Sequence, residues 1–316
     1  MRYRSAAAAV LVLALAGCGG ATSDAGSEPK GGSSSGGTVN LAINPWVGYE
    51  ANAAVIGYLL EKELGYTVEK KNLKEEVSWQ GFETGEVDVI VENWGHDDLK
   101  KTYIDEKKVA VNVGPTGNQG VIGWYVPQWM VDEYPDITDW NNLNKYADLF
   151  KTSESGGKGQ FLAGDPSFVT NDAALVTNLK LNYKVVYSGS EAAIIKAAQQ
   201  ATAQKKPLLF YFYEPQWLFA KEKYVRVKLP EYTAGCDADP KKVACDYPDY
   251  VLDKIASKKF ADTGGKAYQL VQNFKWTNDD QNLVSDYITN QGMTAEKAAE
   301  KWVTEHEATW KPWIPA

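Results

Sequence analysis

The chain has 316 residues, a length that allows one large domain or two lobes of ordinary size with a sizeable core. A formal net charge of −8 and a pI near 5.0 argue against a nucleic-acid partner, because phosphate binding needs a basic surface. Only 2 His stand beside 11 Trp and 18 Tyr, which argues against a His-rich metal site and against catalysis centred on His. We therefore predict no metal and no organic cofactor.

The first residues carry the features of an export signal. "MRYRSAAAAVLVLALAGC" starts with two Arg, continues with an apolar segment over residues 6–16 and ends in Leu-Ala-Gly-Cys. The apolar segment is too short for a stable membrane span and is typical of a secretory signal. Its ending resembles a bacterial lipobox. We predict a lipoprotein signal peptide over residues 1–18, with lipidated Cys18 as the mature N-terminus; the alternative is a free thiol after a plain signal peptide.

A segment of Gly, Ser and small polar residues follows over residues 19–37. Such a composition cannot bury apolar area, so we predict a flexible tether. The signal and the tether together predict an extracytoplasmic domain that a lipid anchor holds at the outer face of the cell membrane.

Two further cysteines, Cys236 and Cys245, are separated by eight residues rich in Asp, Pro and Lys. In an oxidising compartment this spacing suits a local disulfide that closes a surface loop. A metal site is the alternative, but it would need more ligands than the surrounding sequence offers. We predict the disulfide.

From Thr38 onward the hydrophobic pattern predicts alternating strands and helices. Val39, Leu41 and Ile43 predict a strand that breaks at Asn44-Pro45. Helical spacing follows within residues 49–66, then a strand over 66–73, and a short helix and a strand within 78–94. This alternation is the signature of an open α/β sheet.

The rest of the chain continues the pattern before turning helical. We predict a Gly-rich apolar strand in 118–130, a strand that runs into a loop in 159–168, a helix in 170–183, a strand and a helix capped by Ser190 in 184–207, and strands in 208–217 and 224–232. We predict that the tail beyond Pro248 is helical, including residues 250–260.

Several aromatic residues follow predicted strands. Ligands of open α/β sheets bind beyond the carboxyl ends of the strands, which is where Trp46, Trp94 and Tyr213 stand in the sequence. Aromatic faces attract cations, including cations that have no N–H group to donate. Phe210 and Tyr211 are predicted to pack in the core instead.

From Thr38 to the C-terminus the chain resembles the substrate-binding lipoproteins of ABC importers for quaternary ammonium compounds. The resemblance rests on "NPW", "GEVDVIVENWGH", "GVIGWYVP", "GDPSF" and "YFYEPQW". It implies an α/β fold of the two-lobed, periplasmic-binding-protein-like kind (type II), with the ligand cleft between the lobes. It also implies a monomer that is not an enzyme and that delivers its ligand to a permease and an ATPase.

The resemblance assigns aromatic residues to the ligand. Trp94 matches the Trp that the family delivers at the end of an acidic-hydrophobic strand, and Tyr213 matches the aromatic of the late motif. Trp46 and Tyr125 match aromatic positions of choline-binding relatives. The chain departs from many betaine binders in carrying Phe168 and Tyr213 where those proteins carry Trp.

A polar end of the site is also expected. The helix mouth in "GDPSFVTND" offers backbone N–H groups and neutral side chains for a carboxylate. Near Trp94 the chain carries His96, Asp97 and Asp98. The predicted ligand set is Trp46, Trp94, His96, Tyr125, Ser167, Phe168, Thr170, Asn171 and Tyr213. Glycine betaine is the first expected ligand; choline, carnitine and proline betaine follow.

Two alternatives share these features. An exported enzyme could use Glu92, His96 and Asp97 as acid and base, although no nucleophile motif or phosphate loop accompanies them. A lipoprotein that presents its ligand to a membrane sensor would have the same sequence features as a transporter subunit.

The predicted lobes are discontinuous. Lobe 1 is expected to hold residues 38–118 and 226–316, and lobe 2 residues 119–225, with crossing strands at the two ends of lobe 2. Closure around the ligand would then be a hinge motion.

Overall fold

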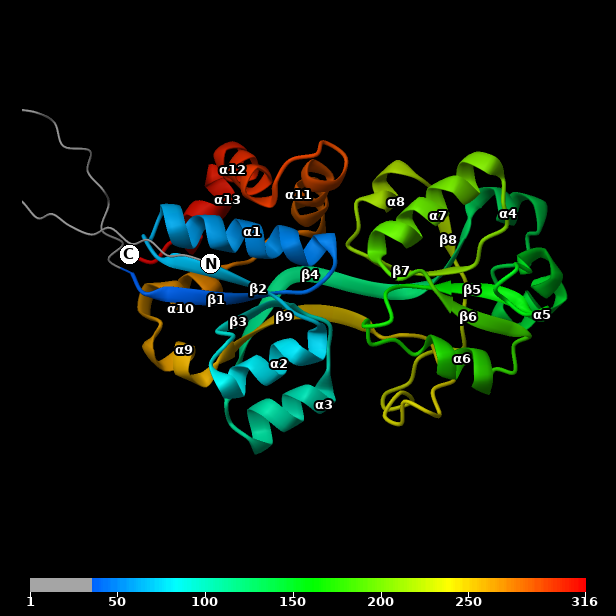
Figure 1. The fold of residues 1–316 in the computed structure, drawn as a ribbon, viewed down its shortest axis with the longest axis horizontal. Coiled ribbons are helices and arrows are strands. Elements are labelled where there is room, and N and C mark those ends of the chain that lie inside the picture. Colours follow the sequence, from blue (N-terminus) through cyan, green and yellow to red (C-terminus); the bar gives the residue numbers. More distant parts are fainter. Residues whose placement is uncertain (1–35) are drawn as a thin grey trace, which may run out of the picture. The chain divides into compact units, whose positions relative to one another are not determined.

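The computed structural model describes residues 36–316, so the predicted signal peptide, Cys18 and residues 19–35 of the predicted tether lie outside the described residues. Within residues 36–316, nine strands form one mixed sheet in the order β2-β1-β3-β9-β4-β7-β5-β6, with β8 paired to β4 (Figure 1). The strands are β1 (Thr38–Ile43), β2 (Thr67–Asn72), β3 (Val89–Asn93), β4 (Ala110–Pro127), β5 (Gly159–Ala163), β6 (Tyr183–Tyr187), β7 (Phe210–Glu214), β8 (Tyr224–Arg226) and β9 (Asp249–Ser257).

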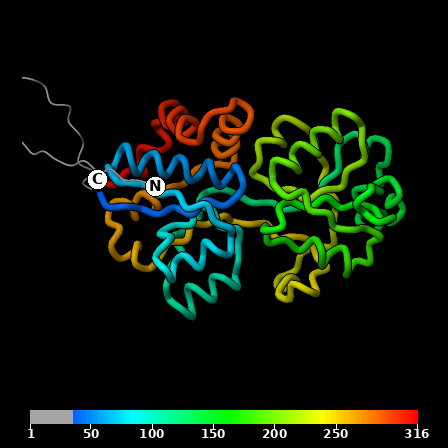
Figure 2. The backbone as a smooth tube through the Cα atoms, in the orientation of Figure 1, coloured from blue at the N-terminus to red at the C-terminus, as the bar shows by residue number. Residues whose placement is uncertain are grey.

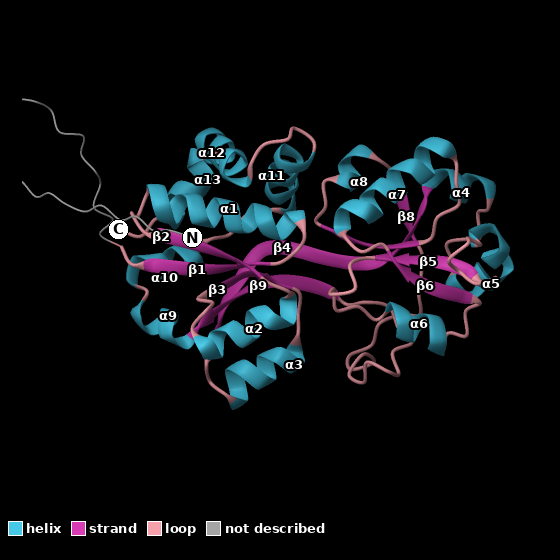
Figure 3. Cartoon of the chain, viewed as in Figure 1, coloured by secondary structure: helices cyan, strands magenta, loops and turns pink. Residues whose placement is uncertain are grey.

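Helices cover both faces of this sheet (Figure 3). The predicted Ser190 cap is present, since its hydroxyl oxygen accepts from the Ala193 N–H at 3.2 Å. The helices are α1 (Val47–Lys62), α2 (Glu75–Thr84), α3 (Asp97–Lys100), α4 (Gln128–Glu133), α5 (Leu143–Tyr146), α6 (Asp172–Asn178), α7 (Glu191–Gln204), α8 (Leu218–Lys221), α9 (Lys258–Thr263), α10 (Gly265–Asn273), α11 (Asn278–Thr289), α12 (Ala295–Glu305) and α13 (Glu307–Trp310).

Strand β4 connects two groups of strands. Its first part pairs antiparallel with β9, and its last part pairs with β7 and β8. We call the group β1, β2, β3 and β9 with its helices lobe 1, and the group β5 to β8 with its helices lobe 2. In Figure 2 the backbone passes between the two groups along β4 and along the segment that leads into β9. These two neighbouring strands are therefore the crossing strands.

The helix predicted over residues 250–260 is wrong, because most of this segment is strand β9. The strand lies inside the sheet between β3 and β4, and residues 252–257 are buried without alternation. A strand covered on both faces does not show the alternating pattern that identifies a half-exposed strand. The sequence alone therefore could not separate this strand from the helix α9 that follows it.

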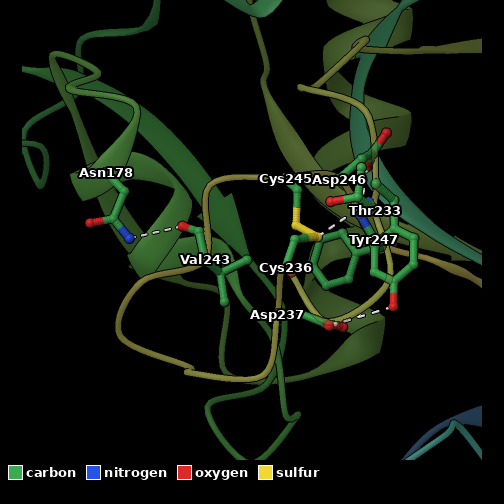
Figure 4. Close-up of a disulfide and its surroundings, with 9 residues drawn as sticks. Asn178, Thr233, Cys236, Asp237, Val243, Cys245, Asp246 and Tyr247 are labelled. Carbon is green, nitrogen blue, oxygen red and sulfur yellow. Dashed lines mark hydrogen bonds between the residues drawn. A yellow bond between two sulfur atoms is a disulfide. The ribbon is translucent and has the colours of Figure 1, made fainter.

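The sequence predicted that the chain returns to lobe 1 at residue 226. In the structure it returns later, through β9. Residues 227–248 instead pack on lobe 2. The Asn178 amide donates to the Val243 carbonyl at 2.8 Å, and the Tyr247 hydroxyl donates to Asp172 at 2.9 Å. The structure joins Cys236 and Cys245 by a disulfide inside this segment (Figure 4). The boundary of lobe 2 therefore moves to the start of β9.

None of the helices in residues 36–316 is long and apolar enough to cross a membrane.

Candidate ligand-binding site

A pocket lies where the two lobes meet, at the carboxyl ends of the strands β1, β3, β5 and β7. About 410 Å³ of space here is not filled by protein atoms, and this volume includes open solvent. Lobe 1, the crossing strands and lobe 2 all contribute to the wall. The lining residues are Trp46, Glu75, Trp94, His96, Ile122, Phe168, Val169, Tyr211, Tyr213 and Tyr250.

Trp46 enters the pocket from the start of α1. Its backbone is extended (φ −140°, ψ 150°), so the residue ends the connection from β1 and its ring projects from the first turn of the helix. The ring stands edge-on to Phe168 of lobe 2, with 5.7 Å between centroids. Trp46 is 7% exposed, which leaves it almost wholly inside the wall.

Trp94 follows strand β3 and packs against residues from both sides of the pocket. Its ring lies edge-on to Tyr213 of lobe 2 at 5.5 Å and to Tyr250 of β9 at 5.8 Å between centroids. The ring also rests on the backbone of β4, because a Cβ atom at Gly120 would lie 2.6 Å from its Cζ3. A glycine at this position therefore makes room for the indole.

Strand β7 contributes two tyrosines. Successive side chains of a strand point to opposite faces, so Tyr211 and Tyr213 face the pocket while Phe210 and Phe212 face the opposite side. The centroids of the two tyrosine rings are 6.0 Å apart. The prediction that Tyr211 packs only in the core is corrected, because this buried residue also lines the pocket.

A buried carboxylate, Glu92, lies behind both tryptophans. The indole N–H groups of Trp46 and Trp94 donate to the same Glu92 oxygen, Oε1, at 2.8 and 2.7 Å. The Asn52 and Gln281 amides donate to the other oxygen, Gln281 at 3.0 Å. Burial raises the pKa of Glu92 to about 7, although the four hydrogen bonds act in the opposite direction.

A second buried carboxylate, Glu191, lies behind Tyr213. It accepts hydrogen bonds from the Tyr213 hydroxyl and from the Gln216 amide, the latter at 2.6 Å. It also accepts from the backbone N–H of Val47 at 2.9 Å, so this residue of lobe 2 contacts the start of α1 in lobe 1. Burial raises the pKa of Glu191 to about 7, against these hydrogen bonds.

The polar part of the wall is an acid–imidazole pair. His96 Nε2 and Glu75 Oε1 are 2.6 Å apart, and both side chains are largely buried. Burial acts to lower the pKa of His96, but the hydrogen bond and the charge of Glu75 outweigh it and raise the pKa above its ordinary value. The pair can therefore offer a carboxylate acceptor and, when protonated, an imidazolium.

Five of the predicted ligand residues line the pocket, and Tyr125 does not. Tyr125 packs with Phe210 and Phe219, at 6.2 and 5.0 Å between ring centroids. Ile122 is the pocket residue of the same strand, and a residue three positions further along points to the opposite face. The five predicted residues in the wall are Trp46, Trp94, His96, Phe168 and Tyr213.

The predicted polar set at the mouth of α6 also lies outside this pocket. Ser167 donates to Asp165 at 2.6 Å, and the Asn171 N–H donates to the Tyr247 hydroxyl at 2.8 Å. Thr170 does not line the pocket either, and the buried carboxylate of Asp172, which accepts from Trp124 and Tyr247, already stands at the start of α6. The polar groups of this loop are thus used within lobe 2, and the loop contributes Phe168 and Val169 to the wall.

Sequence reasoning missed Glu75, Ile122, Val169 and Tyr250. Tyr250 was hidden because its strand was predicted as a helix. Glu75 opens α2 after strand β2, a position comparable with that of Trp46, and this signal could have identified it. Nothing in the sequence distinguished Ile122 and Val169 from ordinary packing residues.

The acid–base arrangement considered for an enzyme does not assemble. Glu92 lies behind the aromatic wall, His96 pairs with Glu75, and Asp97 is exposed and outside the pocket. Among residues 36–316 no three His, Cys, Asp or Glu side chains gather in a way that could hold a metal ion.

The chain is similar to known proteins over most of its length. The family model "Substrate binding domain of ABC-type glycine betaine transport system" (OpuAC) matches residues 37–305. The glycine betaine/carnitine transport binding protein GbuC of Listeria monocytogenes is 28% identical over 116 residues. That alignment covers 37% of this chain and 34% of GbuC, so it spans about a third of that relative.

Solved structures share the fold. Lactococcal OpuAC, closed and complexed with glycine betaine, gives a TM-score of 0.69 at 24% identity over 88% of this chain and 99% of that chain. An ABC-transporter choline-binding protein in complex with choline gives a TM-score of 0.70 at 19% identity, over 87% of this chain and 91% of that chain. The predicted α/β fold of the two-lobed binding-protein type is confirmed. The matched family is one of binding domains, which also confirms the prediction of a binding protein over an enzyme.

Replacement of Gly120 tests the packing of Trp94. In Gly120→Ala the new Cβ would lie 2.6 Å from Trp94 Cζ3 and 2.9 Å from Leu252 Cδ2, so the indole must move. We expect a loss of about 1–3 kcal/mol in the free energy of unfolding, measured in urea, and a changed near-UV circular dichroism spectrum. Gly37→Ala is the control, because no atom lies within 4 Å of its added Cβ. Equal stability of the two variants would contradict the contact.

Replacement of Glu191 tests its burial through the pH dependence of stability. Folding raises its pKa from 4.5 to about 7, so its favourable contribution is complete below pH 4.5 and is lost as the pH rises through about 7. Between about pH 5 and about pH 8 the wild-type chain should lose about 2–3 kcal/mol more stability than Glu191→Gln. Urea unfolding across this range measures the difference, with exposed Glu133→Gln as the control. Parallel pH profiles for wild type and Glu191→Gln would refute the assignment.

Proposed function

Because this chain belongs to the family of substrate-binding domains of ABC-type glycine betaine transport systems, we propose that it captures a quaternary ammonium solute outside the cytoplasmic membrane and delivers it to an ABC permease and its ATPase. The pocket between the lobes would hold the solute.

The observation that carries this proposal is the orientation of the aromatic wall. Both indole N–H groups and the Tyr213 hydroxyl donate to carboxylates behind the wall, so these rings do not offer those groups to a ligand. A trimethylammonium group has no N–H to donate and is bound through ring faces, at about 0.5–2 kcal/mol for each contact. The rings available to it are Trp46, Trp94, Phe168, Tyr211, Tyr213 and Tyr250.

Glycine betaine is the first candidate ligand. Its carboxylate needs a donor, and protonated His96, whose pKa is raised by Glu75, can supply one. The hydroxyl groups of Tyr211 and Tyr250 in the wall can donate as well. With the imidazolium present, the Glu75–His96 pair is neutral and does not repel the carboxylate. Proline betaine and carnitine carry the same two groups, ammonium and carboxylate.

Choline is the second candidate, favoured by Glu75. Glu75 uses Oε1 for His96, which leaves its Oε2 as an acceptor toward the pocket. The hydroxyl of choline can donate to such an oxygen, and choline brings no second negative charge. The two candidates therefore depend differently on the proton of His96.

We also propose that the domain is attached to the outer face of the membrane through lipidated Cys18. The support is the sequence alone: a basic start, a short apolar segment, Leu-Ala-Gly-Cys and a Gly/Ser-rich tether.

Removal of one ring tests the aromatic site. Trp94→Ala should weaken the binding of glycine betaine or choline by about 1–3 kcal/mol, through the loss of a ring face and its buried area. Isothermal titration of the soluble domain (residues 36–316) with glycine betaine, choline, carnitine and proline betaine measures this change. Trp140→Ala, a partly exposed indole outside the pocket, should bind as the wild type does. Tight binding of a sugar with none of the four amines bound would overturn the proposal.

The pH dependence of ligand preference tests the role of His96. As the pH rises through its raised pKa, His96 loses the proton that neutralises Glu75. The binding of glycine betaine should therefore weaken relative to the binding of choline. The nearby charges of Asp98 and Lys100 act on His96 with either ligand. The ratio of the two dissociation constants, measured by titration from about pH 6 to about pH 8.5, should change about tenfold more in wild type than in His96→Gln, where the buried Glu92 and Glu191 still titrate in this range. A flat ratio in the wild type would remove His96 from the site.

Replacement of Cys18 tests the anchor. Full-length Cys18→Ala should leave the chain unlipidated, either released or retained as the uncleaved precursor, because the modified thiol is missing. Mass spectrometry and detergent partition of membrane fractions would show this. Cys18→Ala that is processed and partitions into detergent like the wild type would contradict the predicted lipobox.

A further inference from the structure

We propose that Glu92 determines the charge preference of the pocket. Its carboxylate holds Trp46 and Trp94 in place and supplies negative charge behind both rings, so that the pocket prefers a cation to a neutral molecule of the same shape. This inference rests on the function proposed above and names the residue that gives the site its charge selectivity.

The first argument is that one oxygen atom positions two rings. Trp46 belongs to the start of α1 and Trp94 to the end of β3, yet both N–H groups donate to Glu92 Oε1, at 2.8 and 2.7 Å. An indole has a single polar hydrogen and can only donate, so each bond fixes the rotation of its ring. The geometry of the two ring faces is therefore set from behind by a single side chain.

The second argument is that the surroundings of Glu92 suit an ionised carboxylate. Its other oxygen accepts from the Asn52 and Gln281 amides, so every partner of the side chain is an N–H donor. Gln281 reaches this position over Gly48, where an added Cβ would lie 2.3 Å from the amide nitrogen. A hydrogen-bond shell made of donors stabilises the charged form against burial.

The third argument is that no protein cation balances this charge. Glu92 is 1% exposed, and no ion pair within residues 36–316 includes it. The pocket wall holds no Lys or Arg. A buried carboxylate without a counter-ion is costly, and a cation on the far side of the two indoles would relieve that cost. Indoles that donate to an anion also present more electron-rich faces to that cation.

The other two carboxylates near the pocket, Glu75 and Glu191, have different partners from those of Glu92. Glu75 has the ionisable His96 as its partner, and Glu191 serves one ring while it also contacts the backbone of α1. Glu92 is the carboxylate in contact with two rings of the wall. Its replacement therefore isolates the charge behind the rings better than a change at either of the others.

The experiment compares a cation with its neutral analogue. The mature chain is titrated at about pH 8 with choline and with the tert-butyl analogue of choline, in which carbon replaces nitrogen. Glu92→Gln keeps an oxygen for the two indoles and removes the charge, and exposed Glu133→Gln removes a charge elsewhere.

We expect Glu92→Gln to weaken the binding of choline about tenfold, as two unit charges about 10 Å apart predict at an effective dielectric constant of about 20. The neutral analogue should bind Glu92→Gln and wild type within about twofold, and Glu133→Gln should match the wild type. Equal weakening of cation and analogue would mean that Glu92 only shapes the pocket, and would overturn the charge role. An unchanged affinity for the cation would overturn it as well.

A measurement without ligand separates this inference from the proposed function. In the wild type the indole ¹⁵N–¹H resonances of Trp46 and Trp94 should shift together as Glu92 titrates near pH 7. Glu92→Gln should abolish this shared shift and leave only the smaller effect of the neighbouring Glu191, which titrates in the same range. Resonances that stay fixed from about pH 5 to about pH 8.5, or that move independently, would overturn the shared contact. If neither choline nor glycine betaine binds the wild type, the proposed function fails, while this titration still decides whether Glu92 holds both rings.

Discussion

Hydrogen bonds that buried carboxylates require are the constraint on which the pocket depends. A carboxylate removed from water must receive donors from the protein, and Glu92 and Glu191 receive them from the rings of the wall. The polar groups of these rings are thereby bound behind the wall. One requirement thus explains why aromatic residues from several elements present a common apolar surface.

The same constraint joins the lobes. Glu191 of lobe 2 accepts from the Val47 N–H, one of the backbone donors at the start of α1 that the helix itself cannot satisfy. Trp46 precedes that residue and stands edge-on to Phe168 across the pocket. A change that separated the lobes would therefore leave a buried carboxylate and a helix terminus each short of a partner, next to the ligand.

The sequence allowed the fold class and part of the wall to be predicted, for identifiable reasons. Trp46, Trp94 and Tyr213 follow strands, and the carboxyl ends of strands position ligands in this class of sheet. The prediction for Tyr125 was wrong because the register of β4 with β7 decides which face of the sheet each β4 side chain points to. The sequence does not show this register. Tyr250 was not predictable, since the strand that carries it is recognisable only from its neighbours in the sheet.

The placement of β9 has a consequence for the order in which the chain can fold. This strand lies between β3 and β4 in the sheet although more than a hundred residues separate it from both in sequence. The edges of β3 and β4 that face β9 stay unpaired until residues 249–257 have arrived. The strands β5, β6 and β7 of lobe 2 pair with neighbours that are closer in sequence. Contacts of such long range slow folding and expose strand edges to other chains. We expect lobe 1 to fold late and to be the aggregation-prone part until its final strand is in place.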